Sequence, residues 1–557
     1  MYAPYALKLQ SDCANTQIFY PLLPDHRVIG RDLACTSWIP GLPESCIPAS
    51  LIFAMTNFPT LRVLIHRLCF VTGATVLAGY SVMAAPKPPE PPPLELPKPP
   101  PAQVASSEGM PPLPYPVVPQ KRQEKKNPPQ PPVLLTKIRT NDAEDWTRTP
   151  HDLKGLLEWM SAEMGASFSS NVKTWNEIST DPKNNPVLYR SGYKPFTLTH
   201  EEATKLREYL RQGGTIIFNC LVGHPDFYQS AQEAARQILP ESPLYRLRLD
   251  HPVFHACHDI NQVTYRERAI RDGVVSDAYP WLDGTDIDNR TAIFISRWDI
   301  ALGWEQNAHE SWGYSDADAK RLGANLVSYV TAMQEAGRGV GQSVELTDTG
   351  DGNAGNFRVA WVVHDGPWKT RPTALPQLLK KFNEATGAPV SFNVRDVRLT
   401  EQTLFESPFL YLTGTTDFSL SESERSNLRQ FLLKGGVLFA EASDGRSSFD
   451  RAFRAELGLI FPDQALAPLA PDHPIFTQPN VIQKVKPRPA LAARLDKVLE
   501  ISPAIEILTL NDSPAVIYTP HDLSAGWEQA PAPYAIGYDA THATALGINI
   551  LFHALLR

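Results

Sequence analysis

The stretch NPVLYRSGYKPFTLTHEEATKLREYLRQGG at residues 185–214 returns in related form as SPFLYLTGTTDFSLSESERSNLRQFLLKGG at residues 407–436. The offset between the two stretches is 222 positions. Further along the chain the offset is 223, from DIALGWEQ at Asp299 to DLSAGWEQ at Asp522. A match of this length with only single-residue shifts indicates an internal duplication. We therefore predict two homologous domains.

Each copy alternates signals for strands and helices. In the second copy the apolar run PFLYLTG at residues 408–414 is typical of a buried strand. Leu428, Phe431 and Leu432 then recur at helical intervals, and Gly435 supplies a left-handed stop. Alternation of this kind requires a mostly parallel sheet with helices on both faces. We predict an α/β fold of two homologous, flavodoxin-like, three-layer αβα sandwiches.

Length and composition favour a multidomain globular protein. The 557 residues exceed what one hydrophobic core usually supports, and 43% of them are hydrophobic against 20% charged. The net charge of -8 argues against a nucleic-acid binder. Six cysteines without a CxxC pair do not form a disulfide scaffold or a structural zinc site. We predict no metal and no cofactor.

We predict an export signal in the N-terminal region. Residues 68–85, LCFVTGATVLAGYSVMAA, are uncharged, follow basic residues and end in small ones, as a signal peptide does. Because such a signal is expected near the start of a chain, we predict translation from Met55 and treat residues 1–54 as an upstream extension. The alternative is an uncleaved membrane anchor, since 18 uncharged residues just reach a membrane-spanning length.

A proline-rich segment follows, in which 19 of the 47 residues from Pro86 to Pro132 are proline. This composition favours an extended, disordered spacer, and a polyproline ligand for a partner is the alternative. We expect the protein to be exported to the periplasm or cell surface. The predicted parts are the extension (1–54), the signal peptide or anchor (55–85), the proline-rich linker (86–132), the first repeat (133–339), a second linker (340–355) and the second repeat (356–557).

The repeated motifs resemble a known family. The run from Pro408, followed by Asp-His-Pro-Ile-Phe from Asp472, Gly-Trp-Glu from Gly526 and Leu-Gly-x-Asn from Leu546, is similar to the bacterial domain-of-unknown-function family 4159. The resemblance covers nearly all of the second copy and implies a bacterial origin and a fold related to class I glutamine amidotransferases. It implies no activity. The first copy lacks the acidic pair that family members tend to carry after the Gly-Gly strand.

A nucleophile is expected where a strand ends, because ligands of open α/β sheets bind beyond the carboxyl ends of strands. Cys220 occupies such a position, with His224 or His251 as a base. No Gly-x-Cys-x-Gly elbow surrounds it, and the other copy has Ala442 there. A buried, inert cysteine is the alternative. A disulfide between Cys220 and Cys257 is a third interpretation.

Two Asp-His-Pro motifs are the next candidates, Asp250-His251-Pro252 and Asp472-His473-Pro474. A carboxylate beside an imidazole can orient a general base or bind a metal. The same residues before proline also commonly cap turns and loops, and we favour that interpretation.

The Gly-Trp-Glu motifs are the third candidates. Each places two carboxylates and an aromatic ring after the last parallel strand, an arrangement that suits a sugar, a peptide or a cation. Alternatively the tryptophan fills the core while the acids cap a helix. The predicted ligand-binding residues are Asp299, Trp304, Glu305, Asp522, Trp527 and Glu528.

Two functions remain open at this level. The first is a non-catalytic tandem module of the cell envelope that binds a protein, carbohydrate or peptide. The second is a hydrolase or amidotransferase-like enzyme that uses Asp444, Asp472, His473 and Glu528. If these four side chains meet in one pocket, the enzyme hypothesis gains support.

Overall fold

The structure is a computed structural model that describes residues 133–165, 168–183, 185–339 and 357–556. The predicted extension, the signal or anchor, the proline-rich linker and the second linker all lie outside these residues. Within them, no helix has the length and apolar character needed to cross a bilayer.

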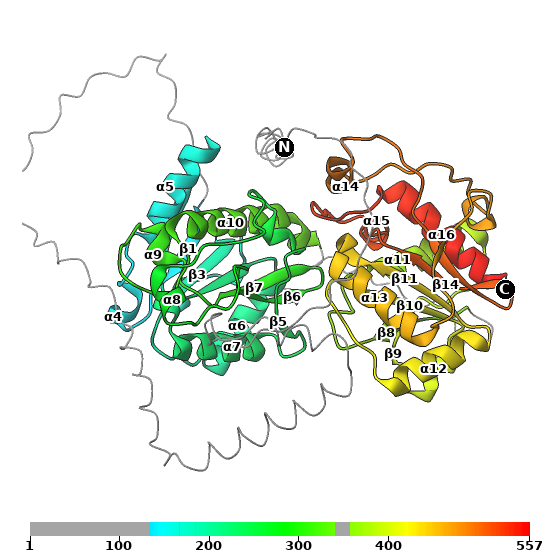
Figure 1. The fold of residues 1–557 in the computed structure, drawn as a ribbon, viewed down its shortest axis with the longest axis horizontal. Coiled ribbons are helices and arrows are strands. Elements are labelled where there is room, and N and C mark those ends of the chain that lie inside the picture. Colours follow the sequence, from blue (N-terminus) through cyan, green and yellow to red (C-terminus); the bar gives the residue numbers. More distant parts are fainter. Residues whose placement is uncertain (1–132, 166–167, 184, 340–356, 557) are drawn as a thin grey trace, which may run out of the picture. The chain divides into compact units, whose positions relative to one another are not determined.

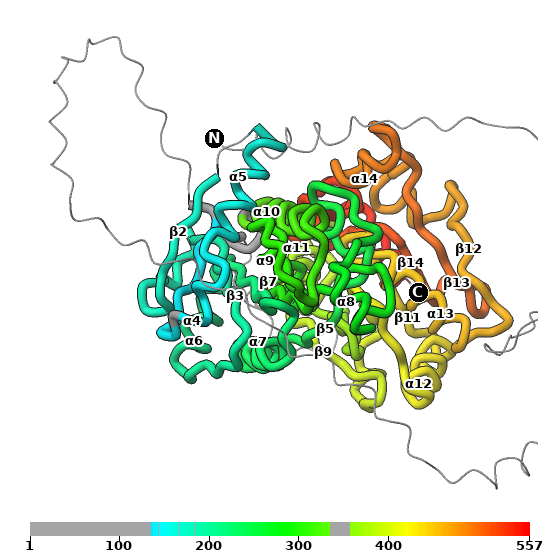
Figure 2. Tube along the Cα trace, turned by 60° about the vertical axis from the view of Figure 1, so that its left-hand side comes forward, coloured from blue at the N-terminus to red at the C-terminus, as the bar shows by residue number. Residues whose placement is uncertain are grey.

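Both repeats contain a seven-stranded sheet of the same topology. Figure 1 draws the strands of both repeats as arrows, and Figure 2 traces the course of the chain through the labelled elements. The first sheet has the order β2-β1-β3-β4-β7-β6-β5 and the second β9-β8-β10-β11-β14-β13-β12. In each, the first four strand pairings are parallel and the last two are antiparallel. The strands are β1 (Val133–Ile138), β2 (Ser169–Lys173), β3 (Val187–Gly192), β4 (Thr215–Cys220), β5 (Leu244–Arg246), β6 (Leu282–Ile287), β7 (Arg290–Ser296), β8 (Val359–Val363), β9 (Arg395–Arg398), β10 (Phe409–Gly414), β11 (Val437–Ala442), β12 (Ala467–Pro468), β13 (Glu506–Leu510) and β14 (Ser513–Thr519).

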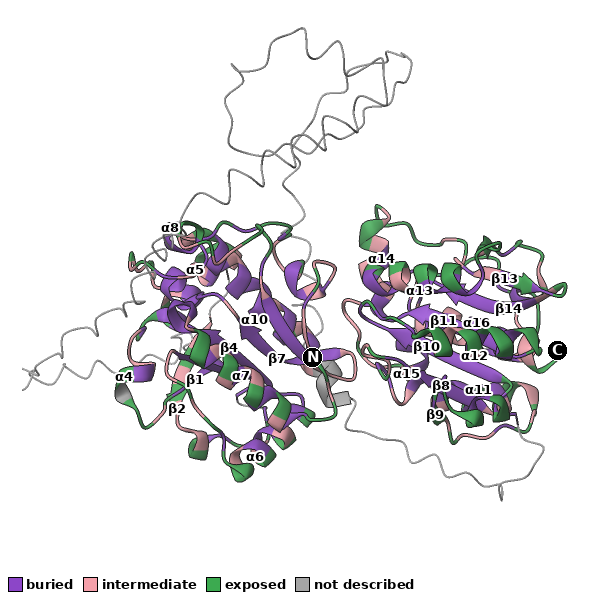
Figure 3. Cartoon of the chain, turned by 60° about the horizontal axis from the view of Figure 1, so that its bottom comes forward, coloured by how far each residue is buried: buried purple, intermediate pink, exposed green. Residues whose placement is uncertain are grey.

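Helices cover both faces of each sheet, so the predicted three-layer sandwiches are confirmed. The helices of the first repeat are α4 (Ala143–Trp146), α5 (Asp152–Met164), α6 (His200–Arg211), α7 (Pro225–Ile238), α8 (Glu267–Arg271), α9 (Ala301–Trp304) and α10 (Asp316–Gly339). Those of the second are α11 (Ala374–Thr386), α12 (Glu422–Leu433), α13 (Ser447–Ile460), α14 (Pro489–Arg494), α15 (Ser524–Glu528) and α16 (Ala540–Leu555). In the second repeat α11, α15 and α16 pack on one face of the sheet and α12 and α13 on the other. Figure 3 shows the buried strands between the more exposed helices.

The Gly-Gly pair has two separate roles. In the second repeat, α12 begins with a capping box of Ser421 and Glu424. After the helix ends, Gly435 adopts a φ of 97°, which disfavours other residues. A Cβ at Gly436 would lie 2.3 Å from the Phe431 ring, so this second glycine makes room for an aromatic side chain. The pair therefore serves helix termination and packing.

The Gly-Trp and Leu-Gly motifs pack against each other. The Trp527 indole is buried and donates from Nε1 to the carbonyl oxygen of Ala543 at 2.9 Å. A Cβ at Gly547 would lie 2.8 Å from that Nε1 and 2.7 Å from Leu378. Gly526 similarly lets α15 approach α16 at Ala543. These motifs hold α11, α15 and α16 together beneath the strand ends.

We expect Gly547→Ala to destabilise the protein by about 1–3 kcal/mol, because the added methyl group overpacks the core between Trp527 and Leu378. Thermal unfolding measures the effect. Gly458→Ala is the matched control, since nothing lies within 4 Å of its Cβ position in α13. That control should stabilise by roughly 0.5–1 kcal/mol through helix propensity. Equal effects of the two substitutions would contradict the packing account.

Candidate functional site

The carboxyl ends of β10, β11 and β14 meet at one edge of the second sheet. Thr413 on β10 is in register with Glu441 on β11, which is in register with Thr519 on β14. The loops that follow these strands carry Ser443 and Asp522. In open α/β sheets this edge is where ligands bind. We call it the strand-end site.

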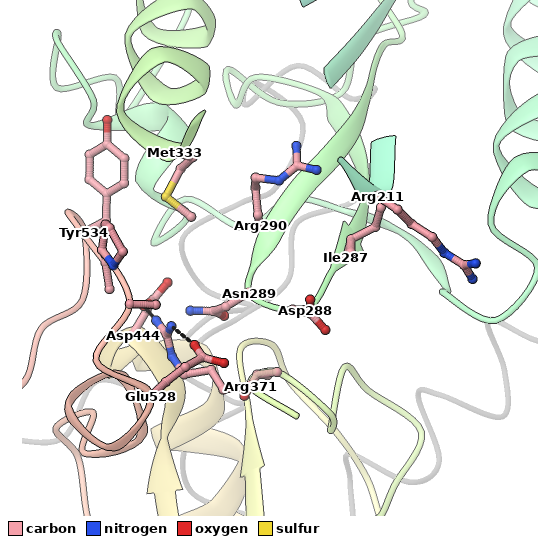
Figure 4. A pocket seen from close by; sticks show the side chains of 14 residues that line it. Arg211, Ile287, Asp288, Asn289, Arg290, Met333, Arg371, Asp444, Glu528 and Tyr534 are labelled. Atoms are coloured by element: carbon pink, nitrogen blue, oxygen red, sulfur yellow. Dashed lines mark hydrogen bonds and ion pairs between the residues drawn. The ribbon is translucent and has the colours of Figure 1, made fainter. Parts of the chain in front are cut away.

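An arginine lies at the centre of the strand-end site. The Arg371 guanidinium is buried and faces three carboxylates, as Figure 4 shows for two of them. Nη2 donates to Oδ1 of Asp444 at 3.0 Å, and Nη1 donates to Oε2 of Glu528 at 3.2 Å. Nε lies 3.5 Å from Oδ2 of Asp522. Burial lowers the pKa of Arg371, but the three carboxylates outweigh it and raise that pKa above its ordinary value. The arginine therefore stays charged and holds the acids together.

Asp522 joins two loops in a way that both repeats share. Its Oδ2 accepts from the backbone N–H of Asp444 at 2.6 Å, and its Oδ1 accepts from that of Ala525 at 2.7 Å. In the first repeat, Asp299 accepts from the N–H groups of Val222 and Ala301 at 2.7 and 2.8 Å. Val222 and Asp444 both have a φ of 53°. The aspartate thus stabilises the strained turn that follows β4 in the first repeat and β11 in the second. It also stabilises the start of the helix that follows the neighbouring strand, α9 after β7 and α15 after β14.

Glu441 is a second buried acid at this edge. It accepts hydrogen bonds from the Tyr411 hydroxyl at 2.5 Å and from the backbone N–H of Leu523 at 2.6 Å. Burial and the neighbouring Asp522 raise the pKa of Glu441 to about 7. The first repeat has the neutral Asn219 at this position, which accepts from the N–H of Ile300. At the same place in this hydrogen-bond network, the first repeat therefore has an amide and the second has a carboxyl group.

Several buried polar atoms of the strand-end site have no hydrogen-bond partner. They are Thr370 Oγ1, Arg371 Nε, Thr413 Oγ1, Ser443 Oγ and Arg488 Nη1. Such atoms usually find a partner when they are buried, and an orphaned group calls for an explanation such as a bound ion, water or ligand. Because the hydroxyls can donate and accept while arginine only donates, the site offers both kinds of contact.

The matching positions of the first repeat have no orphaned atoms of this kind. Ser191, which corresponds to Thr413, accepts from Nδ2 of Asn219 at 2.9 Å. Thr149, which corresponds to Arg371, donates to Asp152 at 3.0 Å. Leu221 and Val222 replace Ser443 and Asp444 and are buried. At these positions the first repeat has apolar or hydrogen-bonded side chains, whereas the second repeat has polar side chains without hydrogen-bond partners.

The tryptophans predicted as ligand-binding residues lie in the core instead. Trp304 and Trp527 are 1% and 2% exposed, and each indole N–H donates to a backbone carbonyl of the last helix. The carboxylates of Glu305 and Glu528 accept from the His151 N–H and the Thr373 hydroxyl, respectively, both at 2.5 Å. Both tryptophans therefore fill the core, which was the alternative interpretation of this motif. Asp522 and Glu528 do lie at the strand-end site.

The predicted cysteine nucleophile has an unfavourable environment. Cys220 is fully buried at the end of β4, and burial raises the pKa of its thiol well above the ordinary value. A thiol of this kind stays protonated and inert. No disulfide joins Cys220 to Cys257. The structure therefore agrees with the inert-cysteine alternative.

The Asp-His-Pro motifs cap short helical turns. His473 Nδ1 accepts from the N–H of Ile475 at 3.2 Å, and His251 Nδ1 accepts from that of Val253 at 3.1 Å. The His473 ring lies 5.3 Å from that of His553, near the end of α16. His553 lies fourteen positions along the chain from Asp539 at the helix start, a distance of roughly 20 Å along the helix axis.

The four residues of the enzyme hypothesis consequently do not meet in one pocket. Asp522 is bridged to Gly537, just before α16 begins, and Asp444 and Glu528 are linked through Arg371 near that start. His473 lies at the opposite end of the helix, and Asp472 precedes it in an exposed turn. The structure joins Asp444 and Glu528 and leaves Asp472 and His473 apart.

Sequence reasoning did not find Arg371, Glu441 and the orphaned hydroxyls as site residues. The exchange of Asn219 for Glu441 between the copies was a visible signal, because an acid replaces an amide at the end of a strand. Arg371 carried no signal, since it stands in a loop 151 residues before Asp522.

Comparison with known proteins identifies the family to which the chain belongs. The fold and its strand-end sites define a tandem protein of two doubly wound αβα domains. The family model of the domain of unknown function DUF4159 matches residues 134–331 and 358–555, and the chain belongs to this family. No curated protein matches it. Among solved structures it is similar to a proposed phosphosugar isomerase from Silicibacter pomeroyi DSS-3, at 10% identity over 56% of this chain and 75% of that one, with a TM-score of 0.15.

We expect Glu441→Gln to change the pH dependence of stability. The folded-state pKa of Glu441 is about 7 against an ordinary 4.5, so the folded state holds a proton that the unfolded state releases. Wild-type stability should therefore fall as pH rises from about 4.5 to 7, and the glutamine should remove this loss, roughly 1–3 kcal/mol above pH 7. Chemical denaturation from pH 5 to 8 measures it.

The exposed Glu500→Gln serves as the control and should leave the pH profile unchanged. If Glu441→Gln destabilises the protein equally at every pH, the carboxyl group is ionised in the folded state and the assignment is wrong.

Proposed function

We propose that the protein is a non-catalytic binding protein of the bacterial cell envelope, and that its second repeat binds a small polar ligand at the strand-end site. The observation that carries the proposal is the group of buried atoms without partners around Arg371, Thr413 and Ser443. The first repeat has the same fold and the same hydrogen bonds to its aspartate, Asp299, but the matching positions hold no such group of atoms.

Orphaned polar atoms cost free energy. A buried donor or acceptor without a partner destabilises a fold by about 1–3 kcal/mol. In the first repeat Asn219 satisfies Ser191, so the same framework can exist without this cost at the Thr413 position. Strain and unsatisfied groups of this kind tend to persist at sites that bind ligands. A ligand with oxygen or nitrogen atoms would supply the missing partners.

The same contacts favour binding over catalysis. Asp522 is occupied by two backbone N–H groups and Asp444 by Arg371. Glu528 accepts from Arg371 and from the Thr373 hydroxyl. Carboxylates that accept from such donors are held in place by the protein. These three acids therefore serve to shape the site.

The envelope location rests on the sequence of the N-terminal region. The uncharged run at residues 68–85 and the proline-rich stretch at 86–132 together suit a protein that is exported and held on a spacer. Proteomic identification of the mature N-terminus tests this part.

The binding proposal predicts opposite effects of Thr413→Val on stability and on binding. Removing an orphaned buried hydroxyl should leave the unliganded protein equally stable or stabilise it by about 1 kcal/mol. The same change should weaken ligand binding. The measurement is the ligand-induced rise in melting temperature of the full chain with a panel of neutral disaccharides, amino acids and dipeptides. Ser443→Ala should behave in the same way.

Thr285→Val is the matched control, because Thr285 Oγ1 in the first repeat is also buried without a partner. It should leave the ligand-induced rise unchanged. The proposal fails if no probe raises the melting temperature of the wild type, or if Thr413→Val and Thr285→Val respond alike.

A further inference from the structure

Arg488 of the strand-end site occupies the same backbone position in the second repeat as Arg266 does in the first. Each arginine is the residue just before a short helix, α14 or α8. The backbone N–H of Arg488 donates to the carbonyl oxygen of Gly537 at 2.8 Å, and that of Arg266 donates to the carbonyl oxygen of Gly313 at 2.9 Å. The two side chains can therefore be compared directly.

In the first repeat each nitrogen of the Arg266 guanidinium has a partner. Nε donates to the carbonyl oxygen of Tyr314 at 3.1 Å. Nη1 donates to the carbonyl oxygens of Asn307 and His309 at 2.8 and 2.9 Å. Nη2 donates to Oδ1 of Asp316 at 2.6 Å, which gives the arginine a counter-ion. Arg266 therefore joins the loop before α10 to the start of that helix.

The second repeat has the arginine but not its counter-ion. The Gly-Tyr pair at 313–314 recurs at 537–538, so Ala540 stands where the first repeat has Asp316. Within the described residues the Arg488 side chain makes no hydrogen bond or ion pair, and its Nη1 is buried without a partner. Burial lowers the pKa of Arg488, because the surrounding acids do not offset the cost of burying its charge.

The acids that act on Arg488 are engaged elsewhere. Its charge interacts with those of Asp522, Asp444 and Asp539. Asp522 accepts from two backbone N–H groups, and Asp444 pairs with another arginine. Asp539 begins α16, where it accepts from the N–H of His542 at 2.9 Å and lies 2.6 Å from Nδ1 of the same residue. The Arg488 guanidinium is therefore available to a ligand.

A guanidinium without a counter-ion matches an oxyanion. Its N–H groups only donate, and their forked geometry fits two oxygens of a carboxylate or phosphate. A neutral ligand would leave the charge of Arg488 without a counter-ion. The Thr413 and Ser443 hydroxyls of the same site are fully buried and have no partner, so they can bond to further polar atoms of the same ligand.

From these observations we infer that the ligand of the strand-end site carries an oxyanion, a carboxylate or a phosphate, and that Arg488 binds this group. The inference rests on the proposed function and names the chemical class of its ligand. The oxyanion takes the role beside Arg488 that Asp316 has beside Arg266. The first repeat thus holds a carboxylate of its own where the second receives an anion from outside the chain.

The first test is isothermal titration calorimetry of the full chain. The oxyanion probes are acetate, N-acetylglycine and methyl phosphate, and the neutral matches are acetamide and N-acetylglycinamide. At least one oxyanion should bind, its neutral match should not, and Arg488→Gln should weaken the binding at least tenfold. Arg398→Gln removes the same charge from an exposed position on β9 and should bind as the wild type does.

The second test restores the missing counter-ion within the chain. Ala540→Asp should raise the melting temperature of the unliganded protein and abolish oxyanion binding, because the new carboxylate pairs with Arg488 as Asp316 does with Arg266. Thr541→Asp is the matched control, since it adds the same charge to the first turn of α16 at an exposed position. The control should bind the oxyanion as the wild type does.

The outcomes separate this inference from the proposed function. If neutral probes bind with sensitivity to Thr413→Val but not to Arg488→Gln, the strand-end site binds a ligand and the oxyanion inference is overturned. The inference is also overturned if no oxyanion binds, or if Ala540→Asp and Thr541→Asp bind it equally. Binding of carboxylates alone or of methyl phosphate alone supports the inference and identifies the group. Circular dichroism of each variant establishes that it is folded.

Discussion

The hydrogen bonds of one buried aspartate organise the carboxyl-end edge of the sheet in each repeat. Asp522, like Asp299 in the first repeat, joins the turn after one central strand to the helix that follows its neighbour. Because these bonds stabilise a residue with positive φ, the turn keeps its shape even when its side chains change. The side chains at the strand ends were therefore free to diverge after the duplication.

The two copies diverged in opposite directions on this framework. In the first, Asn219 bonds to Ser191, and apolar Leu221 and Val222 close the edge. In the second, Glu441 introduces an acid whose pKa is raised by burial to about 7. Asp444 introduces another acid, which burial would make costly without a nearby cation. Arg371 supplies that cation, and removing one partner of such a buried group costs about 3–5 kcal/mol. The second edge is thus stabilised, yet it keeps buried polar atoms without hydrogen-bond partners, which we propose that a ligand satisfies.

Much of the fold was predictable from the sequence because its signals are local or repeated. The duplication located both domains, and the glycine stop at Gly435 ended a helix as expected. The motif around Trp527 was harder, since an aromatic beside acids suits a ligand as well as a core. Only packing against Gly547 and the carbonyl of Ala543 decides that the ring is internal.

The centre of the site depended on contacts that the sequence does not encode locally. Arg371 meets Asp444 and Glu528 only because the loop before α11 folds over the strand ends, and no pattern near Arg371 indicates this. The Asp-His-Pro motifs suggested a general base or a metal site for the opposite reason. His473 and its neighbours are adjacent in sequence, but the imidazole is used to cap a backbone N–H group.

A high-resolution crystal structure of the full chain, soaked with a ligand that binds it, tests the central claim most directly. The account predicts density for the ligand, or for water that links it to the protein, within hydrogen-bond distance of Thr413 Oγ1, Ser443 Oγ or Arg371 Nε. Density only elsewhere, with these atoms bonded to other protein groups, would contradict it.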